Sequence, residues 1–354
     1  MKGTWKLAAA ALAAAALGVA LGLAGCGGDD ESGSGTTGAA TQGAADGSSV
    51  KVGLVTDVGQ LNDRGFNQLA FEGVQQAKAE LGIQYRVIES ASDADYIPNM
   101  QSLADQGYDL IIGVGFAQGD AIATVAKEYP DTSFAIIDVD QSSLAGTPAN
   151  VIGLLFQEEQ VGYLAGVLAA TVAKDEGADT ISSVGGMKEP PVDRFIAGYQ
   201  AGAKATVPEI TVLNGYSQDW DDVAKCKEVA LDQIARGSKI VFQVAGGCGL
   251  GALDAAKEKD VYGIGVDADQ SFVGPQVLTS AMKRVDRAVF LTIKDVVDGA
   301  FAGGRNAVYG LEQDGVALGT MSPAVGADAK SAVEAARKQI VAGEISDIPR
   351  EVSG

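Results

Sequence analysis

The sequence contains no histidine, and its 354 residues include 46 acidic but only 26 basic side chains. Histidine is the commonest general base and metal ligand in proteins, so its absence excludes every catalytic arrangement that depends on an imidazole. The formal net charge of -20 argues against a surface that binds nucleic acid or anionic lipid, because both require clustered lysine and arginine. Any ligand is therefore expected to be small, and an enzyme would have to work with carboxylates and lysines.

Cysteine is scarce as well, and the first of the three, Cys26, ends a distinctive N-terminal segment. Two lysines precede an apolar run over residues 7–23, and small residues follow the run directly before Cys26. This pattern resembles a bacterial lipoprotein signal that is cleaved before Cys26, whose sulfur then carries diacylglycerol. An uncleaved transmembrane helix is the alternative, but about 17 residues is at the short limit for a span.

We therefore expect residues 1–25 to be a signal peptide and residues 26–49 to be the lipidated cysteine and a flexible linker. Gly, Ser, Thr and Ala dominate the linker, and such a composition cannot bury a core. The sequence thus predicts a protein that a lipid anchor holds at the extracytoplasmic face of the cell membrane. A monomer is the expected state.

From residue 50 onward, short apolar runs alternate with helical patterns of ten or more residues. The first of these helices is expected to begin near Phe66 and to end at Gly82, with apolar residues three and four positions apart. This alternation is typical of a parallel sheet covered by helices on both faces. Two such series follow one another, so we predict an α/β fold of two lobes, each a doubly wound parallel sheet.

Residues that can bind a ligand follow the predicted strands. Open parallel sheets bind ligands just beyond the carboxyl ends of their strands. Five strand ends carry such residues: Asp57, Phe116, Asp138, the pair Gly246 and Gly247, and Asp267. An aspartate after a strand is often only a helix cap, but five such sites in two lobes predict a ligand cleft between them.

Long motifs between residue 51 and about residue 319 resemble the basic membrane protein family. They include "VTDVGQLNDRGFNQLAFEG", "EEQVGYLAGVLAA", "VGGMKEPPVDRFIAGYQAG", "AGGCGLGALDAAKE" and "GVDADQ". Characterised members of that family resemble purine nucleoside receptor A, a surface lipoprotein with the two-lobed type I periplasmic binding protein fold. The resemblance implies a receptor without enzyme activity, cofactor or metal, which delivers nucleosides to the permease and ATPase subunits of an ABC transporter.

The resemblance also implies aromatic plates that stack on a nucleoside base. Phe66 would be the plate of the first lobe, and Trp220, in "YSQDWDD", the opposing plate of the second lobe. Trp220 could instead be a core or surface residue in a loop after a strand. Phe116 and Phe195 could each line the cleft or pack within a lobe.

The polar groups of a nucleoside need fixed hydrogen-bonding partners. By resemblance, Asp57, Asn67 and Asp138 would bind the base edge or part of the sugar, while Asp267 and Lys283 would bind the ribose hydroxyls. We expect the chain to cross between the lobes three times, so that the lobes can close around the ligand. The predicted first lobe comprises residues 50–152 and 277–308, and the second comprises residues 153–276 and 309–354.

The remaining cysteines are predicted to form a disulfide. Cys226 lies near the start of the helix predicted over residues 223–235, and Cys248 lies just beyond the strand predicted over residues 239–244. A helix antiparallel to its following strand places both cysteines at the same edge of the sheet, and exported proteins live in oxidising surroundings. The alternative is two unrelated small buried residues.

Three rival functions remain open. A nucleoside hydrolase would also use aspartates at strand ends, but we find neither a tight aspartate cluster for calcium nor a histidine to protonate the leaving base. A sugar receptor of the same fold would also use aromatic plates and carboxylates. A nucleoside-sensing lipoprotein would use the same cleft and differ only in its membrane partner.

Overall fold

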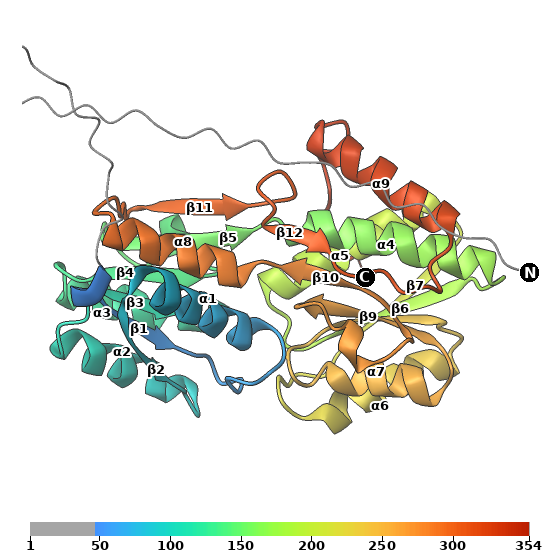
Figure 1. Cartoon of the computed structure of the whole chain (residues 1–354). Coiled ribbons are helices and arrows are strands. Elements are labelled where there is room, and N and C mark those ends of the chain that lie inside the picture. The colour runs from blue at the N-terminus through green and yellow to red at the C-terminus, as the bar shows by residue number, and fades with distance from the viewer. Residues whose placement is uncertain (1–46, 354) are drawn as a thin grey trace, which may run out of the picture. The chain divides into compact units, whose positions relative to one another are not determined.

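The computed structural model describes residues 47–353 (Figure 1). The predicted signal peptide, Cys26 and most of the predicted linker lie outside this range. The linker was expected to reach residue 49, but Gly47–Ser49 form a short 3-10 turn. Gly47 is buried so closely against the end of the first helix that an added Cβ would lie 2.5 Å from the Leu81 carbonyl oxygen. The packed part of the chain therefore begins earlier than predicted.

The first lobe is built on a six-stranded, fully parallel sheet with the order β11-β5-β4-β3-β1-β2. Its strands are β1 (Lys51–Val55), β2 (Gln84–Ile88), β3 (Leu110–Gly113), β4 (Ser133–Ile137), β5 (Val151–Phe156) and β11 (Arg305–Tyr309). Its helices are α1 (Phe66–Leu81), α2 (Tyr96–Asp105), α3 (Gly119–Glu128) and α8 (Val285–Val297). As predicted, α1 ends at Gly82, which adopts the left-handed conformation and donates to the Lys78 carbonyl.

The second lobe repeats this arrangement with the order β12-β10-β9-β8-β6-β7. Its strands are β6 (Thr180–Gly185), β7 (Thr211–Tyr216), β8 (Ile240–Val244), β9 (Tyr262–Asp267), β10 (Val277–Lys283) and β12 (Val316–Leu318), of which β12 alone is antiparallel to its neighbour. Its helices are α4 (Glu158–Asp175), α5 (Pro190–Thr206), α6 (Val223–Ala235), α7 (Leu250–Glu258) and α9 (Ala327–Val341). The predicted two-lobed α/β fold is therefore confirmed.

Both faces of each sheet are buried, as the continuous apolar runs predicted. In β1, Val52 and Leu54 face the core that includes α1 and α8, whereas Val55 faces α2 and α3. In the second lobe, α4 and α5 cover one face, and α6 and α7 cover the other. In residues 47–353, no helix is both long and apolar enough to cross a membrane.

Two of the three predicted lobe boundaries differ from the structure. All of β5 pairs within the first sheet, so the first crossing follows Phe156 and not residue 152. Strand β10 lies between β9 and β12 in the second sheet, so the second crossing follows Lys283 and not residue 276. The third crossing follows Tyr309, within one residue of the prediction. Residues 277–283 therefore belong to the second lobe because strand pairing, which a single sequence does not reveal, holds them there.

Helices α4 and α5 lie in backbone contact along a seam of four glycines. An ideal Cβ on Gly162 or Gly166 of α4 would lie 2.2 or 2.1 Å from a carbonyl oxygen of α5. Likewise, a Cβ on Gly198 or Gly202 of α5 would lie 2.2 or 2.0 Å from a carbonyl oxygen of α4. No larger residue fits at these positions without moving a helix, and the seam fixes the N-terminal ends of both helices, which reach the candidate site.

Candidate ligand-binding site

A cavity lies between the two lobes at the carboxyl ends of their strands. Its empty volume is about 620 Å³ when the part open to solvent is included, within the range of about 300–1,000 Å³ that is usual for small-molecule sites. All eleven residues that were predicted to bind ligand line it: Asp57, Phe66, Asn67, Phe116, Asp138, Phe195, Trp220, Gly246, Gly247, Asp267 and Lys283. The structure brings these residues together, and their roles toward a ligand stay predictions.

Other residues that were not predicted to bind ligand also line the cavity, and two of them, Asp63 and Glu189, carry carboxylates. Glu189 is half-buried and directly precedes α5, whose first residue is Pro190. Burial, followed by the charges of Asp57 and Asp138, raises the pKa of Glu189 to about 7. A proline at the first position of a helix marks its start. That signal after β6 could have placed Glu189 at a strand-to-helix turn on the binding edge.

The turn before α1 is organised by Asp63. Its carboxylate accepts hydrogen bonds from the backbone N–H groups of Gly65 (2.9 Å), Asn67 (2.8 Å) and Gln68 (3.2 Å). These groups would have no partner within the helix, so Asp63 defines where α1 begins. Burial raises the pKa of Asp63, and the three hydrogen bonds oppose that shift. Phe66, the first residue of α1, is thereby fixed at the cavity wall.

Asn67 and Asp57 form a second polar unit beside this turn. The Asn67 Nδ2 donates to Asp57 Oδ1 (2.8 Å), which also accepts from the Gly59 N–H (2.9 Å). Asp57 keeps part of its surface open, but its burial raises its pKa to about 6 against these hydrogen bonds. Asn67 is buried, and its Oδ1 has no hydrogen-bond partner in the described protein. The cavity thus offers at least one acceptor that a ligand could satisfy.

Lys283 occupies the end of β10, where the chain crosses to the first lobe. Its ammonium lies 2.6 and 2.7 Å from the two carboxylate oxygens of Asp138 and 2.9 Å from Glu158 Oε1. All three side chains are almost completely buried. Burial alone would lower the pKa of Lys283, but the charges of Asp138 and Glu158 raise it above its usual value. The ammonium also lies 5.1 Å from the centre of the Phe66 ring and 6.0 Å from that of Phe195.

This cluster joins two residues whose predicted roles differ. Asp138 was expected to bind either the base edge or the sugar, and Lys283 was expected to bind the sugar. The ion pair places both side chains at the same end of the cavity, and their roles toward a ligand stay predictions. Glu158, the third member of the cluster, was not among the predicted site residues.

Two aspartates at the cavity have unusual backbone conformations. Asp138 follows β4 with a φ of 71°, and Asp267 ends β9 with a φ of 62°. Non-glycine residues seldom adopt this left-handed region, and such residues cluster at functional sites. The two positions are equivalent, because β4 and β9 are the fourth strands of their lobes. Burial raises the pKa of Asp267 to about 7, although the nearby Lys283 charge opposes the shift.

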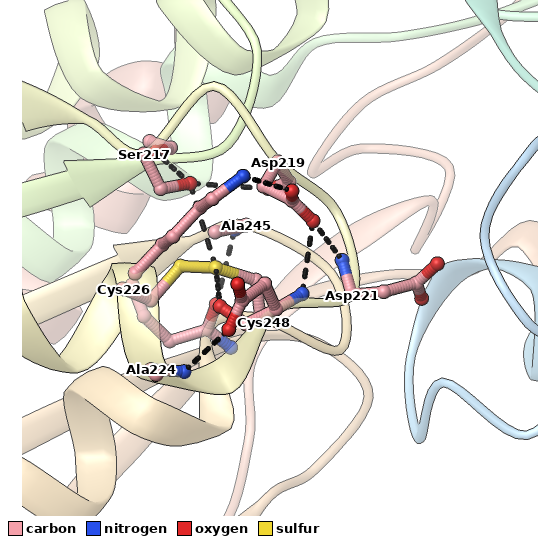
Figure 2. The surroundings of a disulfide bond; sticks show 11 residues. Ser217, Asp219, Asp221, Ala224, Cys226, Ala245 and Cys248 are labelled. Atoms are coloured by element: carbon pink, nitrogen blue, oxygen red, sulfur yellow. Dashed lines mark hydrogen bonds and ion pairs between the residues drawn. A yellow bond between two sulfur atoms is a disulfide. The ribbon is translucent and has the colours of Figure 1, made fainter.

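The loop that carries Trp220 is anchored to the predicted disulfide (Figure 2). Cys226 and Cys248 are bonded, with their Cα atoms 5.6 Å apart. The Cys248 N–H donates to the Trp220 carbonyl (2.7 Å), so the loop is tied to the segment that contains Gly246 and Gly247. On its other side the indole packs against Gly186, where an added Cβ would lie 2.4 Å from the ring. The second wall of the cavity is thus fixed before any ligand arrives.

The raised carboxyl pKa values predict an unusual dependence of stability on pH. Asp57, Asp138, Asp267 and Glu189 have folded-state pKa values of about 6 to 7, compared with about 4 in an unfolded chain. Between pH 4 and 7 the folded protein therefore binds more protons than the unfolded chain, and its stability falls as the pH rises. We expect the melting temperature of the ligand-free protein to be higher at pH 5 than at pH 8.

Differential scanning calorimetry checks this expectation. The variant Asp267→Asn provides the control, because asparagine tolerates a positive φ and cannot ionise. Its melting temperature should change less between pH 5 and pH 8. A wild-type protein that melts at a lower temperature at pH 5 than at pH 8 would contradict the prediction.

Two doubly wound sheets whose strand ends meet at one cavity define the class of type I solute-binding receptors. A solute-binding protein of an ABC transporter from Aeropyrum pernix K1 has this fold, with a TM-score of 0.77 and 28% sequence identity over 85% of this chain and 94% of that one. The chain belongs to the Bmp family, described as "ABC transporter substrate-binding protein PnrA-like", whose model matches residues 50–351. It is therefore a substrate-binding protein of an ABC transporter and not an enzyme, and its partners are a transporter and a small-molecule ligand.

Two relatives illustrate the family. The "ABC transporter nucleoside-binding protein BmpA" of Lactococcus lactis subsp. cremoris is 35% identical over 346 residues, which cover 92% of this chain and 94% of the relative. An uncharacterized lipoprotein of Pyrococcus horikoshii is 36% identical over 282 residues, covering 76% of this chain and 69% of the relative. The predicted resemblance to the basic membrane protein family is confirmed.

Proposed function

We propose that this protein captures nucleosides, purine nucleosides above all, and delivers them to the permease and ATPase subunits of an ABC transporter. The observation that carries the proposal is a cavity in which an aromatic plate from each lobe, Phe66 and Trp220, lies among polar groups that are mostly hydrogen-bond acceptors. The name of the Lactococcus lactis relative supports the same ligand class.

The aromatic pair suits a flat base. Phe66 and Trp220 come from different lobes, so a base between them would touch both and favour the closed form. Stacking between a base and an aromatic ring contributes about 1–3 kcal/mol. Phe195 lines the same cavity and packs edge-on against Phe242 in the second lobe, so both readings of Phe195 apply.

The polar groups suit a neutral ligand that is rich in donors. Asp57, Asp138, Asp267 and Glu189 present carboxylates, while Lys283, the one lysine among the described residues that line the cavity, is already paired with Asp138 and Glu158. A phosphate or carboxylate on the ligand would meet repulsion in this low-dielectric site. Ribose hydroxyls and base N–H groups would instead donate to the carboxylates. This charge balance supports nucleosides over nucleotides.

The base end and the ribose end can be assigned to different residues. Asp57 and Asn67 lie together beside the start of α1, so we assign them to the base edge. Asp267, Asp138 and Lys283 form the other group, which we assign to the ribose hydroxyls.

We further propose that the protein is a lipid-anchored monomer at the extracytoplasmic face of the cell membrane. In this proposal residues 1–25 are the signal peptide, Cys26 carries the lipid, and the following residues tether the lobes. The pattern around Cys26 and the lipoprotein name of the Pyrococcus relative support it.

Isothermal titration of the chain from residue 27, stripped of ligand by refolding, tests the ligand class. Adenosine, guanosine and inosine should bind tightly, while ribose and free bases should bind weakly. Phe66→Ala and Trp220→Ala should each weaken nucleoside binding by about 5- to 150-fold, the loss of about 1–3 kcal/mol of stacking.

The variant Tyr85→Ala serves as the control, because Tyr85 is 39% exposed and does not line the cavity. It should bind nucleosides as the unmodified chain does. Binding of glucose or another free sugar without nucleoside binding would favour the sugar receptor and overturn the proposal, as would no binding at all.

A further inference from the structure

The turn before α1 also contacts the second lobe directly. Gln270 Nε2 donates to the Arg64 carbonyl oxygen (3.3 Å), and the Arg64 guanidinium lies 5.3 Å from the centre of the Phe272 ring. The Asp221 carboxylate faces the backbone of Gln60, which opposes the rise that burial causes in the pKa of that carboxylate. These contacts join the lobes, and none of the five residues is among those that line the cavity.

The Gln270 amide is oriented before the lobes meet. Its Oε1 accepts from Gln243 Nε2 (2.6 Å) and from the Val266 N–H (3.3 Å), both in the second lobe. The backbone N–H of Gln270 donates to Ser280 Oγ (2.9 Å), and the residue is only 1% exposed. The amide therefore has one defined orientation, in which Nε2 is the group left for the first lobe.

Asp221 is also held within the second lobe, through its backbone. Its backbone N–H donates to Asp219 Oδ1 (2.9 Å), which also accepts from the Asp222 N–H. Figure 2 shows the Asp221 side chain pointing away from the disulfide and toward the blue ribbon of the first lobe. The loop that positions Trp220 thus presents an acceptor to the other lobe as well.

Arg64 is the first-lobe residue that receives two of these contacts. Its φ of 56° lies in the left-handed region, which arginine seldom adopts. Both partners of Arg64 belong to the second lobe. Gln270 donates to the Arg64 carbonyl oxygen, and the Phe272 ring lies beside the Arg64 guanidinium. Beside it, an ideal Cβ on Gly65 would lie only 3.7 Å from Asp267, so the lobes are in contact along this turn.

We propose that Gln60 and Arg64 of the first lobe and Asp221, Gln270 and Phe272 of the second lobe form a closure latch. These are positioning residues, which stabilise the closed form without touching the ligand. When the closed form is only partly populated, the apparent affinity falls in proportion to its population. The latch therefore sets the affinity for the ligand and the residence time of the complex. It rests on the proposed function in one respect, namely that closure of the lobes traps a ligand.

The double variant Asp221→Ala/Phe272→Ala tests the latch. Both side chains lie at the surface, and Phe272 is 55% exposed, so their removal leaves both cores intact. Losing the carboxylate that faces the Gln60 backbone and one exposed cation–π contact should weaken the binding of adenosine, guanosine and inosine by roughly 5- to 50-fold. The factor should be the same for all three probes, and dissociation should be faster, because the latch contacts no part of the ligand.

Hydrogen–deuterium exchange of the full-length protein without ligand gives an independent readout. The amides of residues 59–65 should exchange faster in the double variant, while the melting temperature stays unchanged. Val308→Ala is the control, because Val308 is 51% exposed on β11, away from the latch.

Unchanged exchange at residues 59–65 together with affinities within twofold of the unmodified protein would overturn the latch. A loss of affinity that differs among the three probes would also overturn it, since that result assigns a direct role at the ligand. If no nucleoside binds at all, the proposed function fails, and the exchange measurement still decides whether the latch exists.

Discussion

Replacing Gly202 by alanine is expected to destabilise the protein by about 3 kcal/mol, the upper end of the cost of overpacking. The new Cβ would lie 2.0 Å from the carbonyl oxygen of Tyr163 and 2.8 Å from its carbonyl carbon. Backbone atoms cannot rotate away as a side chain can, so α4 and α5 would have to separate. The higher helix propensity of alanine, about 1 kcal/mol, cannot offset this overlap.

Urea unfolding, followed by far-ultraviolet circular dichroism, measures the loss as a lower midpoint. Gly119→Ala is a matched control in helix α3, because its Cβ would meet Val139 at an ordinary distance of 3.4 Å. That variant should be neutral or slightly more stable. Equal midpoints for both variants would show that the α4–α5 seam tolerates a methyl group and would contradict the prediction.

Replacing Lys283 by methionine is expected to destabilise the protein by about 3–5 kcal/mol and to abolish ligand binding. Methionine replaces the apolar stem of lysine with an unbranched side chain one atom shorter, but it leaves Asp138 and Glu158 buried without their shared cation. Two buried carboxylates that face each other must then take up protons or separate. Either change alters the end of the cavity that we assign to the ribose.

Neutralising one of the two carboxylates separates the effect of the unpaired charge from the effect of the altered packing. Asp138→Asn in the Lys283→Met background keeps the left-handed backbone, because asparagine tolerates a positive φ. Calorimetry should find that this double variant recovers part of the stability lost in Lys283→Met while binding stays lost. If Lys283→Met alone melts like the unmodified protein, the buried ammonium does not hold the cluster together.

The fold could be predicted because the central strands are short and largely apolar. Leu110–Gly113 and Ile240–Val244 are buried along their whole length and have the composition of central parallel strands. Strand β10 has no such run: Thr279 and Ser280 interrupt it, and both are fully buried by the strands on either side. The local pattern of apolar residues therefore did not predict β10, because the burial of this strand depends on neighbouring strands that are distant in sequence.

The site could be predicted as a set of residues but not as a network. The rule that ligands bind at strand ends, combined with the family resemblance, identified residues that all line one cavity. The pairing of Lys283 with Glu158, and that of Gln270 with Arg64, joins residues far apart in the chain. Such pairs follow from tertiary structure, and no spacing in the sequence encodes them.

The three crossings between lobes have a consequence for how the chain folds during synthesis. Strand β11 completes the first sheet by pairing with β5, and Arg305 lies opposite Ile152. All of β6 to β10 must therefore leave the ribosome before the first lobe can close its sheet. The lobes cannot fold one after the other as independent units, and the nascent chain must keep an unpaired strand edge at β5 until late. A truncation near the C-terminus that removes β11 onward would thus damage both lobes at once.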